Sequence, residues 1–282
     1  MSLLDRIHEC HNGASLDRFL SLCDDGEQIG WLDGGFAATL AAYPEVFTFG
    51  PAGVSLSEQL TNYSTKTKAV SEVVRDLYDK GWFSGWRNEL YPVGTNFYSA
   101  PFFEIERSAA PRFGIRGYGV HINGFVRRPD GIHLWVGRRA KNKPTYPGLL
   151  DNMVAGGLPV GLKPRENVIK ESAEEASVPP EISEKAQSVG VITYKHLFEE
   201  GLKPDVMFIF DMELPSDFVP RSTDGEMESF QMLPAEEVME ICAETTDFKF
   251  NCSVVNIDFF IRHGILTSDN PEYLEIVQGL HG

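Results

Sequence analysis

The sequence predicts an α+β protein with a smaller N-terminal α+β domain, residues 1–112, and a larger domain, residues 113–282. The chain has 282 residues, 42% of them hydrophobic, which is enough to fill the cores of about two domains. Residues 108–114 are rich in small and turn-forming residues, as in a linker. In the second half, predicted strands surround a glycine-rich segment and a helix, an order typical of an α+β sandwich.

Short helices and strands are predicted along the N-terminal domain. Apolar residues recur at helical spacing within residues 3–7, 16–23 and 68–80, and we expect helices there. Gly81 is expected to end the third helix. Short strands are predicted at residues 28–32, 46–49 and 89–93.

The second domain begins with a predicted β-hairpin. Its strands span residues 117–127 and 132–139, and the Pro-Asp-Gly turn at 129–131 joins them. The glycine-rich segment 153–161 leads into a helix predicted over residues 164–177, whose first residue is a proline, as suits a helical N-terminus. Further strands are predicted at 188–197, 206–214 and 229–233, and two apolar helices at 234–243 and 251–265.

The charge of the chain excludes several classes of partner. It carries 25 basic and 41 acidic residues, a formal net charge of −16. Nucleic-acid backbones and anionic membranes would repel so acidic a protein, and we expect neither as a partner. No apolar run approaches the ~18 residues that a membrane span needs. Four cysteines without a Cys-x-x-Cys pair favour a reducing, cytoplasmic location over a zinc site or a disulfide scaffold.

Three acidic residues of the helix predicted at 164–177 carry the main functional signal. At about 100° per residue, Glu171, Glu174 and Glu175 fall on one side, in the same arc as Asn167. The opposite side, which is expected to pack on a sheet, carries Ile169, Ala173 and Ala176. Carboxylates this close repel one another unless a cation lies among them, and Mg²⁺ commonly bridges carboxylates to substrate phosphates. The alternative is a solvated acidic helix face.

Two neighbouring features are suited to binding an anion. Gly156 and Gly157 precede the helix, where glycine lets the backbone approach a ligand and the helix N-terminus favours negative charge. Arg138 and Arg139 begin a dense basic patch, residues 138–143, and a guanidinium binds phosphate oxygens in a forked geometry. Ordinary turns are the alternatives for both features, and the spacing does not choose between the two arginines.

The segment 156–178 resembles the signature of the Nudix hydrolases, which is Gly, five residues, Glu, seven residues, then Arg-Glu-U-x-Glu-Glu-x-Gly-U, where U is aliphatic. Gly156 takes the first position, and residues 170–178, Lys-Glu-Ser-Ala-Glu-Glu-Ala-Ser-Val, align with the end. The departures are Leu162 for Glu, Lys170 for Arg, Ser172 for an aliphatic residue and Ser177 for Gly. The resemblance implies a Nudix α/β/α sandwich in which the three glutamates hold Mg²⁺ or Mn²⁺.

A longer match indicates one Nudix subgroup. The run 150–162, together with Trp-Arg-Asn-Glu-Leu-Tyr-Pro at residues 86–92, is similar to members with an extra N-terminal domain that are often labelled thiamine pyrophosphokinase-related. Some of them hydrolyse oxidised or otherwise damaged thiamine diphosphate to the monophosphate. The resemblance therefore implies Mg²⁺-dependent hydrolysis of thiamine diphosphate or its oxidised analogues to the monophosphate and phosphate. The expected partner is this small-molecule diphosphate, and a homodimer is compatible with the sequence.

Catalysis of this kind needs a carboxylate that orients or deprotonates the attacking water. Glu171 and Glu174 on the helix are candidates, and so is Glu228 in the loop 224–228, where Glu226 is an equal choice. Three alternative functions stay open. The first is a Nudix hydrolase of ADP-ribose, a nucleotide sugar or a dinucleotide. The second is a module that binds a diphosphate without turnover, which the departures from the signature favour, and the third is a diphosphate isomerase.

Overall fold

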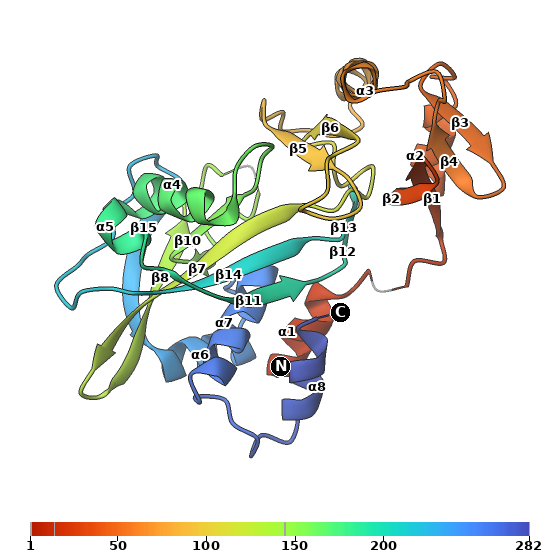
Figure 1. The fold of residues 1–282 in the computed structure, drawn as a ribbon. Helices are drawn as coiled ribbons and strands as arrows, with labels where there is room; N and C mark the ends of the chain where they lie inside the picture. The colour runs from red at the N-terminus through yellow and green to blue at the C-terminus, as the bar shows by residue number, and fades with distance from the viewer. Residues whose placement is uncertain (1, 14, 144, 282) are drawn as a thin grey trace.

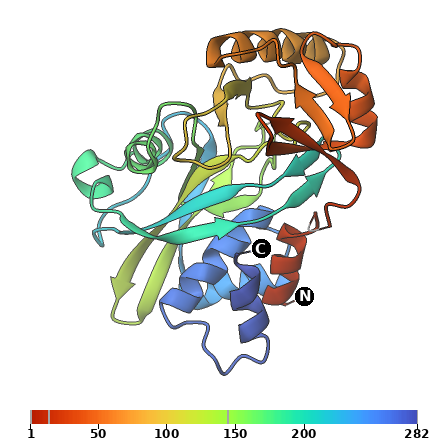
Figure 2. The same ribbon diagram turned by 45° about the vertical axis from the view of Figure 1, so that its right-hand side comes forward.

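The computed structural model describes residues 2–13, 15–143 and 145–281 (Figure 1). It contains a small N-terminal sheet with two helices, and a larger mixed sheet with helices on both faces (Figures 1 and 2). The predicted α+β class is confirmed, and so is the sandwich of one sheet between two helical layers. Among the helices in the described part of the chain, none is both long and apolar enough to cross a membrane.

The N-terminal domain is built on a four-stranded sheet. Its strands are β1 (Phe19–Asp24), β2 (Glu27–Asp33), β3 (Phe47–Gly50) and β4 (Gly53–Leu56), and its helices are α2 (Gly34–Leu40) and α3 (Tyr63–Asp79). The strand order is β2-β1-β4-β3. A separate two-stranded sheet pairs β5 (Leu90–Val93) with β6 (Phe103–Glu106). These elements enclose one apolar cluster, in which Phe36, Phe103 and Phe113 are almost fully buried.

The segment 16–23, predicted as a helix, contains the strand β1 instead. β1 runs antiparallel to β2, and Asp25 and Gly26 form the turn between them, with φ values of 49° and 81°. Asp-Gly is a preferred sequence for a two-residue hairpin turn with positive φ at both positions. β1 also pairs in parallel with β4, and Leu22 is fully buried. The helix prediction was wrong because hairpin and sheet pairing override the helical spacing of the apolar residues.

A mixed seven-stranded sheet forms the centre of the second domain. Its strands are β7 (Tyr118–Arg128), β8 (Gly131–Arg139), β9 (Leu150–Asn152), β10 (Val154–Gly157), β11 (Gln187–Thr193), β14 (Val206–Glu213) and β15 (Met227–Pro234). The order is β11-β14-β7-β8-β15, with β10 paired to β7 and β9 paired to β8. β14 runs parallel to β7. β12 (His196–Phe198) and β13 (Gly201–Lys203) form a small sheet of their own.

Helices cover both faces of the larger sheet (Figure 1). One face carries α4 (Pro164–Ala176) and α5 (Pro180–Ser183), and the other carries α1 (Leu3–Cys10), α6 (Ala235–Glu244), α7 (Phe250–Arg262) and α8 (Tyr273–Gly279). α1 contributes Leu3, Ile7 and Cys10 to the same core as α7 and α8. The domain boundary after residue 112 stays a prediction, but the first helix of the expected N-terminal domain packs in the core of the other domain.

Candidate active site

The short strand β10 places the two predicted glycines beside the predicted helix α4. β10 pairs with β7 along one edge. Along its other edge, Nδ2 of Asn167 donates to the Gly157 carbonyl at 2.8 Å, and the Ala155 amide donates to the Glu175 carboxylate at 2.9 Å. Side chains of α4 thus satisfy main-chain groups that would otherwise lack a partner in the fold. These polar contacts fix the helix to the strand.

The same contacts orient α4 differently from the sequence prediction. The buried residues of the helix are Asn167, Val168, Ser172, Glu175 and Ala176. Ala173, which was expected to pack on the sheet, is exposed. The prediction was wrong at this position because polar contacts with β10, and not apolar spacing alone, set the rotation of the helix. Glu175 consequently lies on the buried face, while Glu174 is exposed.

The three predicted glutamates line one cavity at different depths. Glu175 is 4% exposed, Glu171 is partly buried and Glu174 is exposed. Lys170 donates to Glu171 at 3.2 Å and to Glu174 at 2.7 Å, and so holds these two carboxylates together. A Cβ atom on Gly156 would lie 2.6 Å from Oε1 of Glu171, closer than such atoms pack. Glycine at position 156 therefore leaves the room that this carboxylate occupies.

Burial makes two of these carboxylates harder to ionise. It raises the pKa of Glu175 well above its usual range, against the hydrogen bond from the Ala155 amide, and the charges of Asp151 and Glu171 add to the rise. Burial also raises the pKa of Glu171, against the opposing charge of Lys170. A cation bound among these groups would offset both effects, because a nearby opposite charge favours the ionised form.

The loop before β15 completes a set of oxygen ligands. Ligand oxygens of Glu175, Asp224 and Glu226 all lie within 4.8 Å of one another. Burial acts to raise the pKa of Glu226, but its ion pair with Lys143 holds that pKa below the usual value. Carboxylates of this kind suit hard divalent ions such as Mg²⁺ and Mn²⁺. The residues present therefore fit a divalent ion at Glu175, Asp224 and Glu226. The other two predicted ligands, Glu171 and Glu174, line the same cavity but are not part of this cluster.

Glu228, one of the residues predicted to be catalytic, is not brought to this cluster. It is exposed and does not line the cavity, whereas Glu226 does. The register between β15 and β8 shifts between Met227 and Ser229, so Glu228 is the extra residue of a β-bulge. Of the two glutamates between which the sequence did not choose, the structure places Glu226 at the site.

The two predicted phosphate-binding arginines are engaged in other contacts. All three guanidinium nitrogens of Arg139 donate, one to the Asp151 carboxylate at 2.7 Å and two to carbonyls of the following loop at 3.0 and 2.8 Å. Arg138 donates to the Gly148 carbonyl at 2.9 Å and does not line the cavity. Both side chains hold the loop after β8. Arg139 lines the cavity with each of its guanidinium nitrogens already donating one hydrogen bond, and Arg138 does not line it.

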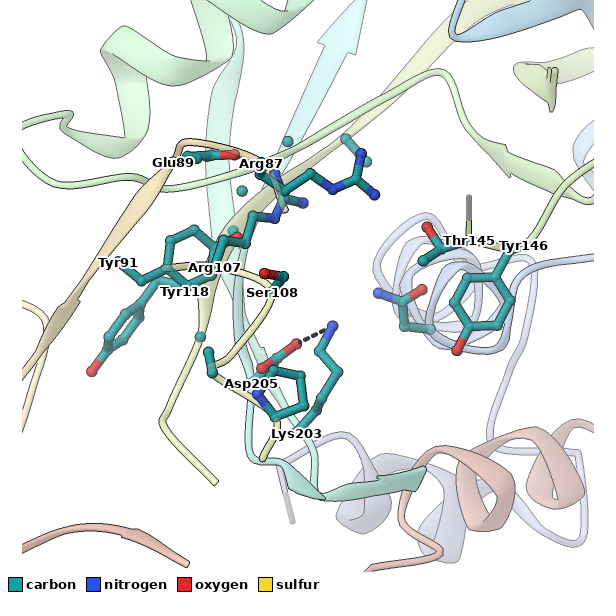
Figure 3. Close-up of a pocket in the computed structure, with 18 of the residues that line it drawn as sticks. Arg87, Glu89, Tyr91, Arg107, Ser108, Tyr118, Thr145, Tyr146, Lys203 and Asp205 are labelled. Carbon is teal, nitrogen blue, oxygen red and sulfur yellow. Dashed lines mark hydrogen bonds and ion pairs between the residues drawn. The ribbon is translucent and has the colours of Figure 1, made fainter. Parts of the chain in front are cut away.

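The cavity encloses about 870 Å³ and is lined by residues of both domains. The N-terminal domain contributes a wall near β5 and β6, whose main residues are Arg87, Glu89, Tyr91, Arg107 and Ser108 (Figure 3). Thr145 and Tyr146 lie across the opening from this wall (Figure 3). Sequence reasoning missed the residues of the N-terminal wall as site residues, although the segment 86–92 carries part of a family motif. Arg107 is not part of any motif or basic cluster that would mark it as a site residue in the sequence.

A second group of polar residues lies at the end of the cavity marked by Lys203 and Asp205 (Figure 3). Asp205 accepts a hydrogen bond from the Tyr194 hydroxyl at 2.9 Å and pairs with Lys203 at 3.1 Å. His121 is buried, with Nδ1 2.8 Å from Oδ1 of Asn152, and burial lowers its pKa to about 4. The imidazole is therefore neutral at pH 7. This end offers a carboxylate, hydroxyl and imidazole groups to the organic part of a ligand.

Comparison with known proteins finds relatives along almost the whole chain. Residues 2–117 match the family model described as Domain of unknown function (DUF4743), and residues 117–253 match the NUDIX domain. Nudix hydrolase 20, chloroplastic, and Nudix hydrolase 24, chloroplastic, both from Arabidopsis thaliana, are 41% and 40% identical over 98% of this chain, and the matches cover 76% and 77% of their lengths. The crystal structure of DR0079 from Deinococcus radiodurans is similar with a TM-score of 0.41 and 18% identity, over 60% of this chain and 96% of that one.

Proposed function

The chain belongs to the Nudix hydrolase family and is a diphosphate hydrolase. We propose that it cleaves an organic diphosphate in the cavity between its domains, with Mg²⁺ or Mn²⁺ bound. Nudix hydrolases generally use divalent metal ions and act on nucleoside diphosphate-linked substrates. The observation that carries the proposal is the convergence of Glu175, Asp224 and Glu226, whose ligand oxygens lie within 4.8 Å of one another beside the cavity.

The carboxylates of the cavity take two different tasks in this proposal. The metal ion would be held by Glu175, Asp224 and Glu226. When bound, it would neutralise charge on the diphosphate and polarise a P–O bond. Glu171, which lines the same cavity and is outside this ligand set, accepts a proton from the attacking water. The water oxygen forms a bond to one phosphorus, the bridging P–O bond breaks, and the two phosphoryl groups separate.

We propose thiamine diphosphate or an oxidised analogue as the first substrate to test. The resemblance at residues 86–92 and 150–162 supports it. So do the rings of Tyr118 and Tyr146, which line the cavity, since aromatic rings stabilise a heteroaromatic ring that carries positive charge. A nucleoside diphosphate-linked compound such as ADP-ribose, a nucleotide sugar or a dinucleotide is the second candidate, which family membership favours.

A turnover screen tests the proposed function. The wild-type protein is incubated with Mg²⁺ and thiamine diphosphate, its oxidised analogues, ADP-ribose, a nucleotide sugar or a dinucleotide, and the phosphate and monophosphate products are measured. We expect Mg²⁺-dependent hydrolysis of at least one compound, and a strongly lowered kcat in Glu175→Gln. Binding without turnover would instead support the diphosphate-binding module, and conversion without release of phosphate or monophosphate would support the isomerase.

A further inference from the structure

The N-terminal domain touches the active-site cavity at the glycine next to Gly156. A Cβ atom on Gly157 would collide with Oη of Tyr91 and would lie 3.2 Å from Cζ of Arg107. Gly156 meets Glu171 of α4, so these neighbouring glycines of β10 contact residues from the two domains. The charge of Arg107 acts on both Glu171 and Glu226. Arg107 therefore lies within electrostatic reach of the carboxylates on α4 and in the loop before β15.

Arg107 is held in place with part of its guanidinium unused. Nη1 donates to the Glu89 carboxylate at 2.7 Å, and Cζ lies 5.5 Å from the ring centroid of Tyr91. The side chain is 42% exposed, and among the described residues Glu89 is the one hydrogen-bond acceptor that the guanidinium has. A guanidinium presents five N–H donors in a fixed fork. The remaining donors are available to a ligand in the cavity.

Arg87 lies on the same wall of the cavity (Figure 3). Its amide donates to the Glu106 carboxylate at 2.8 Å, which fixes the backbone at this position. Its side chain is exposed, and the described residues offer its guanidinium no hydrogen-bond acceptor. Two arginines of the N-terminal domain thus stand together on the wall that faces Thr145 and Tyr146 (Figure 3).

The other cations that line the cavity also lie near carboxylates among the described residues, as Arg107 lies near Glu89. Arg139 pairs with Asp151, Lys143 with Glu226, Lys170 with Glu171 and Glu174, Lys203 with Asp205, and Lys249 with Asp151. A diphosphate carries several negative charges in a protein of net charge −16. Its phosphoryl oxygens need cationic donors in the cavity. The guanidinium of Arg87, to which the described residues offer no acceptor, and the remaining N–H groups of Arg107 present such donors in a fixed fork.

We propose that Arg107, with Arg87 beside it, is the substrate-binding cation of this enzyme and binds the phosphoryl oxygens of the diphosphate from the N-terminal domain. The forked guanidinium suits two oxygens of one phosphoryl group, and the carboxylates of α4 lie on the Nudix side of the same cavity. The N-terminal domain then completes the active site. This inference rests on the proposed function, because it assigns the diphosphate of that reaction a binding residue.

Two measurements on the full chain test this role. The first is kcat and KM on the best substrate of the turnover screen, and the second is calorimetric binding of magnesium pyrophosphate, which needs no turnover of an organic substrate. The variants are Arg107→Met, Arg107→Lys and Arg87→Met. The matched control is Arg127→Gln, because Arg127 is an exposed arginine that pairs with Glu213 and does not line the cavity.

We expect Arg107→Met to lower kcat/KM by about 10²–10³-fold and to weaken pyrophosphate binding by at least about tenfold. Arg107→Lys keeps the charge and loses the fork, so it should recover part of both, and it decides the question if Arg107→Met does not fold. Arg87→Met should have a smaller effect in the same direction, and Arg127→Gln should match the wild type.

The inference would be overturned if both Arg107 variants bound pyrophosphate as tightly as the wild type and kept kcat/KM within about threefold of it. The proposed function would then stay intact. A wild-type protein that binds no magnesium pyrophosphate would overturn it too. Arg107-dependent pyrophosphate binding without hydrolysis of any organic diphosphate would support Arg107 as the anion-binding residue and contradict the proposed function.

Discussion

The carboxylate of Glu171 lies where a side chain of Gly156 would have to be. A Cβ atom on Gly156 would fall 2.6 Å from Oε1 of Glu171. Gly156 pairs with Val120 of the central strand β7, so β10 is held in place by the sheet. The sequence indicated that this glycine lets the backbone approach a ligand, whereas its observed contact is with a carboxylate of the site.

Gly156→Ala should abolish most of the activity while keeping the fold. The atoms that an added methyl group would meet belong to the flexible end of the Glu171 side chain, which can move aside at little cost in stability. Displacing a catalytic group by about 1 Å can lower the rate by roughly 10²-fold. Gly34→Ala is the matched control, because a Cβ atom there meets nothing within 4 Å. Steady-state kinetics and thermal melting check both variants, and an unchanged kcat in Gly156→Ala would contradict the role of Glu171.

Glu226 and Glu228 should differ sharply in their effects on activity. Glu226 lies within the ligand cluster with Glu175 and Asp224, whereas Glu228 is exposed on a bulge of β15. We expect Glu226→Gln to lower kcat/KM by at least about 10–100-fold, the range seen when a residue that merely supports a metal ligand is replaced. Glu228→Gln should stay close to the wild type. The activity of both variants is measured as a function of metal concentration. A larger loss in Glu228→Gln than in Glu226→Gln would show that the loop binds the metal differently.

Glu175→Gln should stabilise the metal-free protein at pH 8 and remove its response to metal. Burial raises the pKa of Glu175 above its ordinary value of 4.5. At a pH between 4.5 and this raised pKa, the folded protein therefore binds more protons than the unfolded chain. Stability therefore falls as the pH rises through this window. Glutamine can still accept the hydrogen bond from Ala155 without ionising.

Urea denaturation in EDTA measures the stability of Glu175→Gln, and melting temperatures with and without Mg²⁺ measure the metal response. Mg²⁺ should raise the melting temperature of the wild type, because a ligand of the folded state stabilises it, and should not raise that of the variant. A metal-free variant less stable than the wild type would contradict this interpretation of Glu175.

His121 should make the protein less stable as the pH falls from 7 to 5. Its pKa is lowered from 6.5 to about 4 by burial, so the unfolded chain takes up a proton in this range and the folded protein does not. The stability that the neutral imidazole contributes is complete above pH 6.5 and declines by about 2 kcal/mol between pH 7 and pH 5. His121→Gln should lack this component. The free energy of unfolding in urea is measured between pH 5 and pH 7. An equal dependence on pH in the wild type and in His121→Gln would contradict the lowered pKa of His121.

Local sequence patterns are sufficient to predict the elements that hold the site. The helix predicted over 164–177 matches α4 because a proline begins it, and Ser177, at φ 54°, ends it in the left-handed conformation where the Nudix signature has glycine. The hairpin of β7 and β8 matches because its turn sequence is specific. The start, the end and the spacing of this segment thus place the three glutamates on one helix, while its contacts with β10 decide how deeply each is buried.

Local sequence patterns do not predict contacts between distant segments, and these contacts decide which side chains reach the cavity. Packing of the N-terminal domain against β10 brings in Arg107, and a bulge in β15 separates Glu226 from Glu228. Arg138 and Arg139 drew attention through local charge density, but a basic run beside a loop can equally bind main-chain carbonyls, as both do here. Charge density alone does not distinguish these two uses.

Anomalous diffraction from a crystal soaked in Mn²⁺ would show whether carboxylates of α4 and of the loop before β15 bind a divalent ion. We expect a manganese peak about 2 Å from carboxylate oxygens of Glu175 and Glu226, with Asp224 within the same cluster. Manganese bound only elsewhere, or no peak at these carboxylates in crystals of an enzyme whose hydrolysis requires Mn²⁺, would contradict this prediction.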